Sequence, residues 1–206
     1  MSKIFGFTAL AMLVSGPVVA APLSFQDILQ QFNLVVLGDA TSDSEVEGRS
    51  YVAGNLSGTS NYWIGGSHAP QAHSDYATLT VGGNLTGPVQ VNRGGNVVVG
   101  GDATGVDLNG GGSATIGGVA TQVQGGPVTS GAAVSPGFSD LFPTSIAQTV
   151  KDSSLSFGSL SGTAAPITGN TAYFGAGMAG LTVYDMTLAQ VSSLGQAVSY
   201  THLTLP

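Results

Sequence analysis

Residues 78–126 form three successive windows that begin alike: TLTVGGNLTGPVQVNRGG (78–95), NVVVGGDATGVDLNGGG (96–112) and SATIGGVATQVQGG (113–126). When the windows are aligned at their paired glycines, apolar residues share columns, as Val81, Val99 and Ile116 do. Neighbouring positions alternate between apolar residues and Thr, Asn, Ser or Gln, and this period of two is typical of short strands with one face inward. Repetition at so short a period predicts a solenoid.

The same frame extends upstream to NLVVLGDAT (33–41) and SYVAGNLSG (50–58). A rung of 16 to 18 residues supplies three short strands and three turns, and the glycines and the Gly-Asn and Gly-Asp steps suit those turns. The predicted fold is therefore mostly β, a parallel β-helix of about five rungs. Its equivalent glycines, at spacings of 16, 29, 18 and 17, are Gly38, Gly54, Gly83, Gly101 and Gly118.

Additional elements are predicted at the two ends of the repeat. Residues 24–31, SFQDILQQ, indicate a short N-terminal capping helix, because Ser24 can cap it and Asp27 follows three residues later. A flanking helix is expected near 143–154, opened by Pro143 and placed against the side of the solenoid. Two C-terminal strands are expected within 170–184.

The two termini do not follow the repeat. Residues 1–20 have the layout of a secretory signal peptide, with Lys3 before an apolar stretch that is too short to span a bilayer and cleavage after Ala20. Residues 198–206, VSYTHLTLP, break with the preceding sequence and are predicted to be a non-native tail, so the native C-terminus would be missing. Residues 21–197 are then expected to form a single domain, secreted or displayed at a cell surface.

The composition excludes several classes of function. Only 7% of residues are charged, against about 25% in ordinary soluble domains. Eleven acidic and four basic residues give a net charge of −7, which argues against nucleic acid and anionic membranes as partners. The absence of Cys excludes thiol catalysis, disulfides and Cys-ligated metals.

Polar residues follow the equivalent glycines and are expected at one corner of successive rungs: Asp39, Asn55, Asn84 and Asp102. Such a row can supply calcium ligands, since hard cations prefer clustered carboxylate and amide oxygens. It can equally form a ladder that accepts hydrogen bonds from turn amides. The ladder is favoured because the GGxGxDx nonapeptide of calcium-binding rolls is absent. Neither a metal nor a cofactor is predicted.

The long interval in the repeat contains TSNYWIGGSHAPQAHSDYA (59–77), which holds the only Trp and two of the three His. A loop that interrupts a regular solenoid is a candidate binding site, and aromatic residues are enriched at binding hot spots. The predicted binding residues are Tyr62, Trp63, His68, His73 and Tyr76. Two alternatives are a metal or acid-base group of His68, His73 and Asp75, and a structural role in which Trp63 packs back on the solenoid.

Several segments together resemble the choice-of-anchor A family of bacterial surface proteins: FNLVVLGDATSDSEVEGR (32–49), YVAGNLSG (51–58), LTVGGNLTG (79–87), VVVGGDATG (97–105) and TVYDMTLAQVSS (182–193). The resemblance covers residues 31–197. It implies a secreted, adhesin-type domain whose C-terminus carries one of several anchors, and it transfers no catalytic residue. The implied partners are a collagen-like matrix protein or a polysaccharide, with membrane attachment only through the missing anchor.

Two other functions compete with adhesion. A carbohydrate-active β-helix enzyme would use acidic residues beside a base, and Asp39, Asp43, Glu45 and Glu47 precede Arg49, although a solvated acidic turn is favoured. An ice- or mineral-binding solenoid would need a regular threonine array on an outward face. The candidate threonines at outward positions are Thr78, Thr80, Thr104, Thr115 and Thr121. Val98 interrupts the column that contains Thr80 and Thr115. The sequence favours an adhesive or matrix-structural domain that is not an enzyme.

Overall fold

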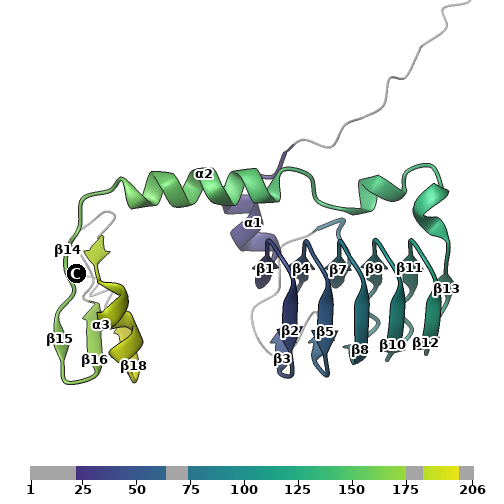
Figure 1. Ribbon diagram of the computed structural model, residues 1–206, viewed down its shortest axis with the longest axis horizontal. Helices are drawn as coiled ribbons and strands as arrows, with labels where there is room; N and C mark the ends of the chain where they lie inside the picture. The colour runs from purple at the N-terminus through teal and green to yellow at the C-terminus, as the bar shows by residue number, and fades with distance from the viewer. Residues whose placement is uncertain (1–21, 64–73, 175–182, 200–206) are drawn as a thin grey trace, which may run out of the picture. The chain divides into compact units, whose positions relative to one another are not determined.

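The protein is mostly β and consists of two compact units, residues 1–149 and 150–206 (Figure 1). The computed structural model describes residues 22–63, 74–174 and 183–199. The first unit is a parallel β-helix in which each rung pairs with the rung before it, so the predicted solenoid is confirmed. Among the residues described, no helix has the length and apolarity needed to cross a membrane.

Each complete rung contains three stretches of extended chain, as the repeat predicts. The first two rungs keep these stretches separate, whereas in later rungs the second and third join into one longer strand. The register shifts within the longer strand between Thr104 and Val106, where a bulge bends it. In chain order the strands are β1 (Leu34–Val36), β2 (Ala40–Ser42), β3 (Glu45–Glu47), β4 (Ser50–Val52), β5 (Leu56–Gly58), β6 (Asn61–Trp63), β7 (Leu79–Val81), β8 (Leu85–Asn92), β9 (Val97–Val99), β10 (Ala103–Leu108), β11 (Ala114–Ile116), β12 (Ala120–Gln124) and β13 (Val128–Thr129).

These strands form two sheets that face each other across the core. Sheet A has the order β1-β4-β7-β9-β11-β13, and sheet B has the order β12-β10-β8-β5-β2 with β3 and β6 joined to it. The pairings between successive rungs are parallel. The predicted equivalence of the glycines is confirmed. Each glycine after the first donates its backbone N–H to the carbonyl of its counterpart one rung earlier, at 2.9 to 3.0 Å, in the series Gly38, Gly54, Gly83, Gly101 and Gly118.

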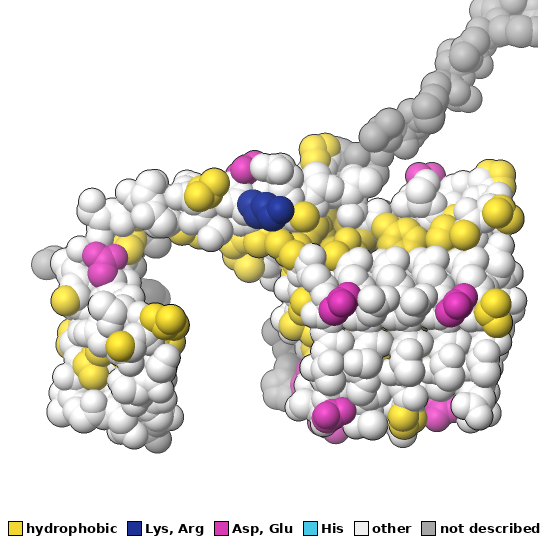
Figure 2. All heavy atoms as spheres, viewed as in Figure 1, with side chains coloured by type: hydrophobic (Ala, Val, Ile, Leu, Met, Phe, Trp, Pro, Cys, Tyr) yellow, Lys and Arg dark blue, Asp and Glu magenta, His cyan; other side chains and the backbone are white. Residues whose placement is uncertain are grey.

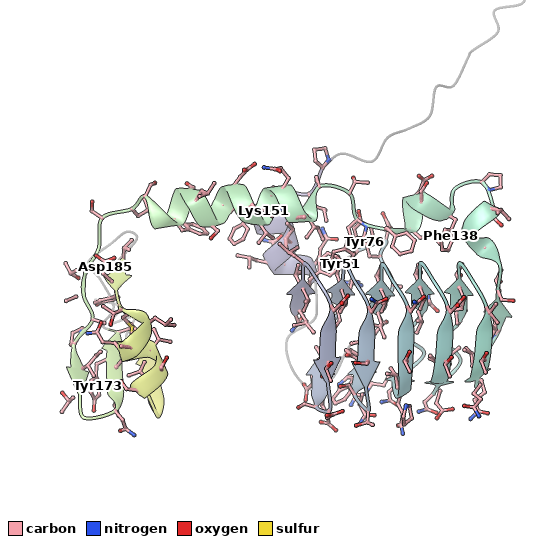
Figure 3. The ribbon with its side chains drawn as sticks, viewed as in Figure 1. Tyr51, Tyr76, Phe138, Lys151, Tyr173 and Asp185 are labelled. Carbon is pink, nitrogen blue, oxygen red and sulfur yellow. The ribbon has the colours of Figure 1, made fainter. Side chains whose placement is uncertain are left out.

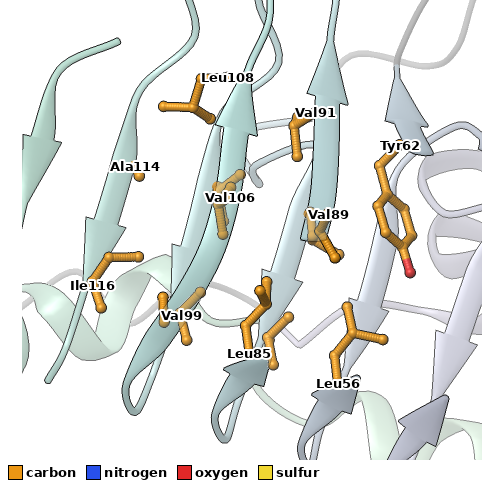
Figure 4. Packing of buried hydrophobic residues seen from close by; sticks show 14 of the residues in the cluster. Leu56, Tyr62, Leu85, Val89, Val91, Val99, Val106, Leu108, Ala114 and Ile116 are labelled. Carbon is orange, nitrogen blue, oxygen red and sulfur yellow. The ribbon is translucent and has the colours of Figure 1, made fainter. Parts of the chain in front are cut away.

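The core is made of apolar columns that run along the solenoid (Figure 4). Val81 pairs with Val99 and Val99 with Ile116, as the alignment predicts, and none of the three has any exposed surface. A second column, Val89, Val106 and Val123, is also in register. Burying one such side chain stabilises the fold by roughly 1.5 to 3 kcal/mol. Stacked similar rungs therefore supply a continuous core in a chain that has no disulfide.

The chain that follows β13 covers the outer side of sheet A. This segment, residues 131–149, contains two short 3-10 helices, η1 (Ala132–Val134) and η2 (Phe138–Leu141). At its start Gly131 donates its N–H to the Gly118 carbonyl at 2.8 Å. At its end the Thr149 hydroxyl donates to the Leu23 carbonyl at 3.1 Å. The segment therefore runs from the last rung back to the beginning of the first unit.

Sheet A is consequently buried on both sides. Thr80 has no exposed surface and Val98 is only 6% exposed, although both point away from the core. Aromatic side chains fill this outer layer, and Figure 3 shows Tyr51, Tyr76 and Phe138 between the solenoid and the covering segment. Sheet A thus offers little free surface to a ligand.

Helix α1 (Phe25–Gln31) begins as predicted, with a capping box at its first turn. Asp27 donates its N–H to the Ser24 hydroxyl at 3.1 Å, and Ser24 donates its N–H to the Asp27 carboxylate at 3.0 Å. The Ser24 hydroxyl also donates to the Asp27 carboxylate, at 2.6 Å, and this bond together with the one from the Ser24 N–H holds the pKa of Asp27 below its ordinary value. Ile28 and Phe32 are buried, so the helix packs firmly at the start of the solenoid.

Helix α2 (Ile146–Gly158) starts three residues later than the sequence indicated. The prediction that Pro143 opens it was wrong, because Ser145 adopts a left-handed conformation with φ of 66° and a helix cannot run through it. The first helical residue, Ile146, is 1% exposed and anchors this turn in the first unit.

The second unit is small and has two short sheets. β14 (Thr163–Ala164) pairs in parallel with β17 (Tyr184–Asp185), and β16 (Thr171–Phe174) pairs with both β15 (Ile167–Thr168) and β18 (Gln196–Ser199). Of the two C-terminal strands expected within 170–184, β16 lies inside this range and β17 begins at its last residue. A further helix, α3 (Leu188–Ser193), has a capping box formed by Thr187 and Gln190.

Replacing Val99 by Asp is expected to abolish folding of the first unit. An unpaired carboxylate in a dry core costs several kcal/mol, which is comparable to the total stability of about 5 to 15 kcal/mol of a typical domain. The measurements are soluble yield, circular dichroism and thermal melting. Val134→Asp is the matched control, because Val134 is 93% exposed and should accept the same change. A soluble Val99→Asp protein with unchanged melting would contradict the register described above.

Candidate functional site

The polar residues at one corner of the solenoid form a ladder of hydrogen bonds. The Asp39 carboxylate accepts from the Asn55 N–H at 2.7 Å, and the Asn55 side-chain oxygen accepts from the Asn84 N–H at 2.8 Å. Asn84 accepts in the same way from Asp102, and Asp102 accepts from the Val119 N–H, both at 2.8 Å. The predicted ladder is confirmed, and this corner ladder satisfies one turn amide at each step between rungs.

The glycine before each ladder residue leaves room for the side-chain oxygen of the preceding rung. A Cβ atom at Gly101 would collide with the side-chain oxygen of Asn84, and one at Gly118 would collide with that of Asp102. Gly38 belongs to the first rung and has open space at the same place. The repeated Gly-Asn and Gly-Asp steps thus have two causes. The turn favours glycine, and the ladder needs a residue without a Cβ atom beside each side-chain oxygen.

The substitution Gly101→Ala is expected to destabilise the protein, because the new methyl group must displace the Asn84 oxygen from its hydrogen bond. Loss of one such bond costs about 0.5 to 1.5 kcal/mol, and any residual clash adds to it. Gly38→Ala is the control at the equivalent, unobstructed position and should be neutral or slightly stabilising. Urea or thermal unfolding of both variants measures the difference. Equal stabilities would show that the ladder does not constrain these glycines.

A chelator is expected to leave the melting temperature unchanged, since hydrogen bonds to amides occupy the oxygen atoms of the corner ladder. Within the described ranges, no group of three or more His, Asp and Glu residues is placed to hold a metal ion. Calorimetry with and without EDTA tests the expectation. A fall in the melting temperature that calcium reverses would assign the corner to a cation instead.

The outer face of sheet B carries an uninterrupted row of hydroxyl side chains, one in each of five successive rungs. Each member pairs in register with the next across β2, β5, β8, β10 and β12. At about 4.8 Å per strand, the row extends over about 19 Å. We call it the hydroxyl row, and its members are Thr41, Ser57, Thr86, Thr104 and Thr121.

The hydroxyl row is exposed, and four of its five members are threonines. All five side chains are exposed or half-buried, in contrast to Thr80 on sheet A. The hydroxyls of Thr41 and Ser57 form a hydrogen bond with each other, at 3.0 Å between the oxygens. Thr86 and Thr104 make no side-chain hydrogen bond to any residue that the structure describes. Threonine is branched at Cβ and has few rotamers, so these hydroxyls lose little freedom when a ligand orders them.

A second polar row lies beside the first, further along each rung. Asn61 pairs with Gln90, Gln90 with Asp107, and Asp107 with Gln124. The Gln124 amide donates to the Asp107 carboxylate at 2.6 Å. Figure 2 shows the resulting face as largely polar and uncharged, with a few scattered acidic groups. Such a face can exchange many hydrogen bonds with a hydroxyl-rich surface.

The threonines named from the sequence do not form one array, because they belong to different sheets. Thr80, Val98 and Thr115 do share a column, but it lies on the outer side of sheet A beneath the covering segment. Thr104 and Thr121 belong instead to the hydroxyl row. The signal was present in the aligned windows, because the residue after Leu85, Ala103 and Ala120 is Thr in all three.

Part of the predicted binding loop is a strand of the solenoid. Residues 61–63 form β6 and belong to the second rung, where Tyr62 pairs with Val46 and Val91. The Tyr62 side chain has no exposed surface, so it belongs to the core, and burial raises the pKa of its hydroxyl. His68 and His73 lie outside the described residues.

The two remaining aromatic residues of the predicted loop are half-buried on its flanks. Trp63 lies beneath the guanidinium of Arg93, with 5.9 Å from Cζ to the ring centroid. Tyr76 packs on Phe32, with ring centroids 5.7 Å apart. Trp63 points away from the core on β6, next to the second polar row. Binding by this loop remains a prediction.

The acidic residues that precede Arg49 do not assemble around it. Asp39 belongs to the corner ladder, Asp43 accepts from the Thr59 N–H at 3.1 Å, and Glu45 and Glu47 point outward from β3. Arg49 is 6% exposed and forms no ion pair with any described residue. This arrangement does not resemble an acid placed beside a base in a groove.

Comparison with protein families places these features in a known class. A family model described as "Putative Ice-binding-like adhesive domain" matches residues 25–205. Comparisons with curated proteins and with solved structures gave no match. The matched range includes every strand of the solenoid and all but the last residue of the second unit.

Proposed function

The chain belongs to the family of ice-binding-like adhesive domains, and we propose that it is an exported, non-catalytic domain that adheres through the outer face of sheet B. The observation that carries this proposal is the hydroxyl row, which is regular, exposed and held by the backbone of five rungs. The proposed ligand is an extended polysaccharide, because a sugar polymer offers repeated hydroxyl groups along a line.

The chemistry of the face supports a sugar polymer over a charged one. The two polar rows offer hydroxyl and amide groups, one carboxylate at Asp107 and no basic side chain, so they suit neutral, hydroxyl-rich partners. Each hydrogen bond contributes only about 0.5 to 1.5 kcal/mol, and useful affinity therefore requires several rungs to bind together. A collagen-like matrix protein, the other expected partner, would need to meet the same flat polar face.

Surface display is the second part of the proposal. It is supported by the signal-peptide layout of residues 1–20 and by the resemblance to the choice-of-anchor A family. An adhesive domain acts outside the cell, which agrees with export.

Ice is the second candidate ligand, and one observation favours it. The hydroxyl row has a single spacing set by the strands, and a crystalline surface can match such a repeat in a way that a flexible polymer need not. Growth of ice crystals in the presence of the protein distinguishes the two ligands. Faceted crystals and a depressed freezing point would favour ice.

The test removes hydroxyls from the middle of the row. The double variant Thr86→Val with Thr104→Val keeps the shape of the face and is expected to weaken binding to insoluble polysaccharide, such as cellulose or chitin, about tenfold. Depletion of the protein from solution by the solid measures the affinity.

The matched control is Thr129→Val with Thr144→Val, which removes two exposed hydroxyls away from the row. It should bind as the parent does. Equal binding by both double variants, or equal loss in both, would overturn the assignment of the hydroxyl row.

A further inference from the structure

A polar cavity of about 420 Å³ opens beside the turn that follows β8. Its lining combines two guanidinium groups with hydroxyl and amide side chains, contributed by Arg49, Arg93, Ser74, Asp75, Thr78 and Asn96. The full sequence has four basic residues, so two of them line this one cavity. That concentration of positive charge stands out in a chain with a net charge of −7.

Arg49 is the buried cation of the cavity. Its Nε donates to the Tyr76 carbonyl at 2.9 Å, and its Nη1 donates to the Gln31 carbonyl at 3.0 Å. These two bonds fix the guanidinium between the end of α1 and the segment before β7. Five N–H groups belong to an arginine side chain, so three remain for other acceptors.

No carboxylate compensates this buried charge within the described part of the chain. Asp75 also lines the cavity, but it is exposed and forms no ion pair with Arg49. Burial lowers the pKa of the Arg49 guanidinium, which shows the cost of desolvating its charge. An anion that entered the cavity would offset that cost and would accept hydrogen bonds from the remaining N–H groups of Arg49.

Arg93 brings a second guanidinium to the cavity from the turn after β8. It lies over the Trp63 ring, and this contact restrains the side chain before any ligand arrives. Two arginines on one cavity suit a planar, two-oxygen anion, because guanidinium groups bind carboxylates in a bidentate way. The hydroxyls of Ser74 and Thr78 and the amide of Asn96 are groups that hydrogen-bond sugars.

We propose that this cavity binds the carboxylate of a uronic acid unit in an acidic polysaccharide. The site is separate from the hydroxyl row, and it does not require that row to bind anything. Arg49 would hold the carboxylate at the bottom of the cavity and Arg93 at its rim. The cavity would thus give the protein a charged anchor point that the uncharged face of sheet B lacks.

The experiment measures binding of oligogalacturonate to the full chain by calorimetry at low and high salt. Arg93→Gln is the test variant, because Arg93 is exposed and the hydrogen bonds of Arg49 hold the fold together. Loss of a charge-assisted hydrogen bond is expected to weaken binding tenfold or more. Lys151→Gln changes the net charge equally and is expected to bind as the parent does.

Methyl-esterified oligogalacturonate separates recognition of the carboxylate from recognition of the sugar, and it is expected not to bind. Three results would overturn the proposal: no binding of oligogalacturonate by the parent, equal binding of the ester, or equal affinities of Arg93→Gln and Lys151→Gln. The double variant Thr86→Val with Thr104→Val should retain full affinity here. The cavity and the hydroxyl row are therefore tested independently.

Discussion

Parallel hydrogen bonding between successive rungs is the interaction on which the rest of the structure depends. It places each residue directly over its counterpart one rung earlier, so a residue type that repeats in the sequence becomes a row in space. Repeated valines become the core, repeated Asn and Asp become the corner ladder, and repeated threonines become the hydroxyl row. A slip of one residue would turn the apolar columns toward solvent, so the core holds all three rows in register.

The two sheets share this geometry and differ in what covers them. The segment after β13 lies over sheet A, and it buries Thr80 so completely that its hydroxyl has no hydrogen-bond partner among the described residues. A buried hydroxyl without a partner costs free energy, and the surrounding apolar contacts must offset that cost. Thr86 occupies the corresponding outward position on sheet B and remains exposed. Covering one sheet therefore leaves sheet B as the broad face of the solenoid on which a ligand can lie.

Local repetition explains why much of the fold could be predicted from the sequence. The apolar columns, the equivalent glycines, the corner ladder and the cap at Ser24 all depend on neighbours that are close in sequence or one rung away. The burial of Thr80 and Val98 depends instead on residues 131–149. These residues do not repeat, so the periodicity of the sequence does not predict where they run. Tyr62 was misplaced for a related reason, since an aromatic residue at the start of an insertion resembles a binding group until its pairing with Val46 and Val91 is known. Helix α2 starts late because Ser145 is left-handed. The sequence did not indicate this conformation, because proline, present here as Pro143, is a common first residue of helices.

Repetition also constrains how the protein can bind. Each rung presents one hydroxyl, and each hydroxyl can form a hydrogen bond of similar free energy. The affinity along sheet B is therefore spread over the rungs, unlike that of an interface in which a few hot-spot residues dominate. Such a surface tolerates the loss of one contact and responds mainly to the number of rungs that meet the ligand, as multivalent binding does. The cavity of Arg49 and Arg93 has the opposite character, because it lies at one turn and depends on charge. The cavity therefore recognises a single acidic unit, whereas binding along the row depends on the length of polymer that lies across successive rungs.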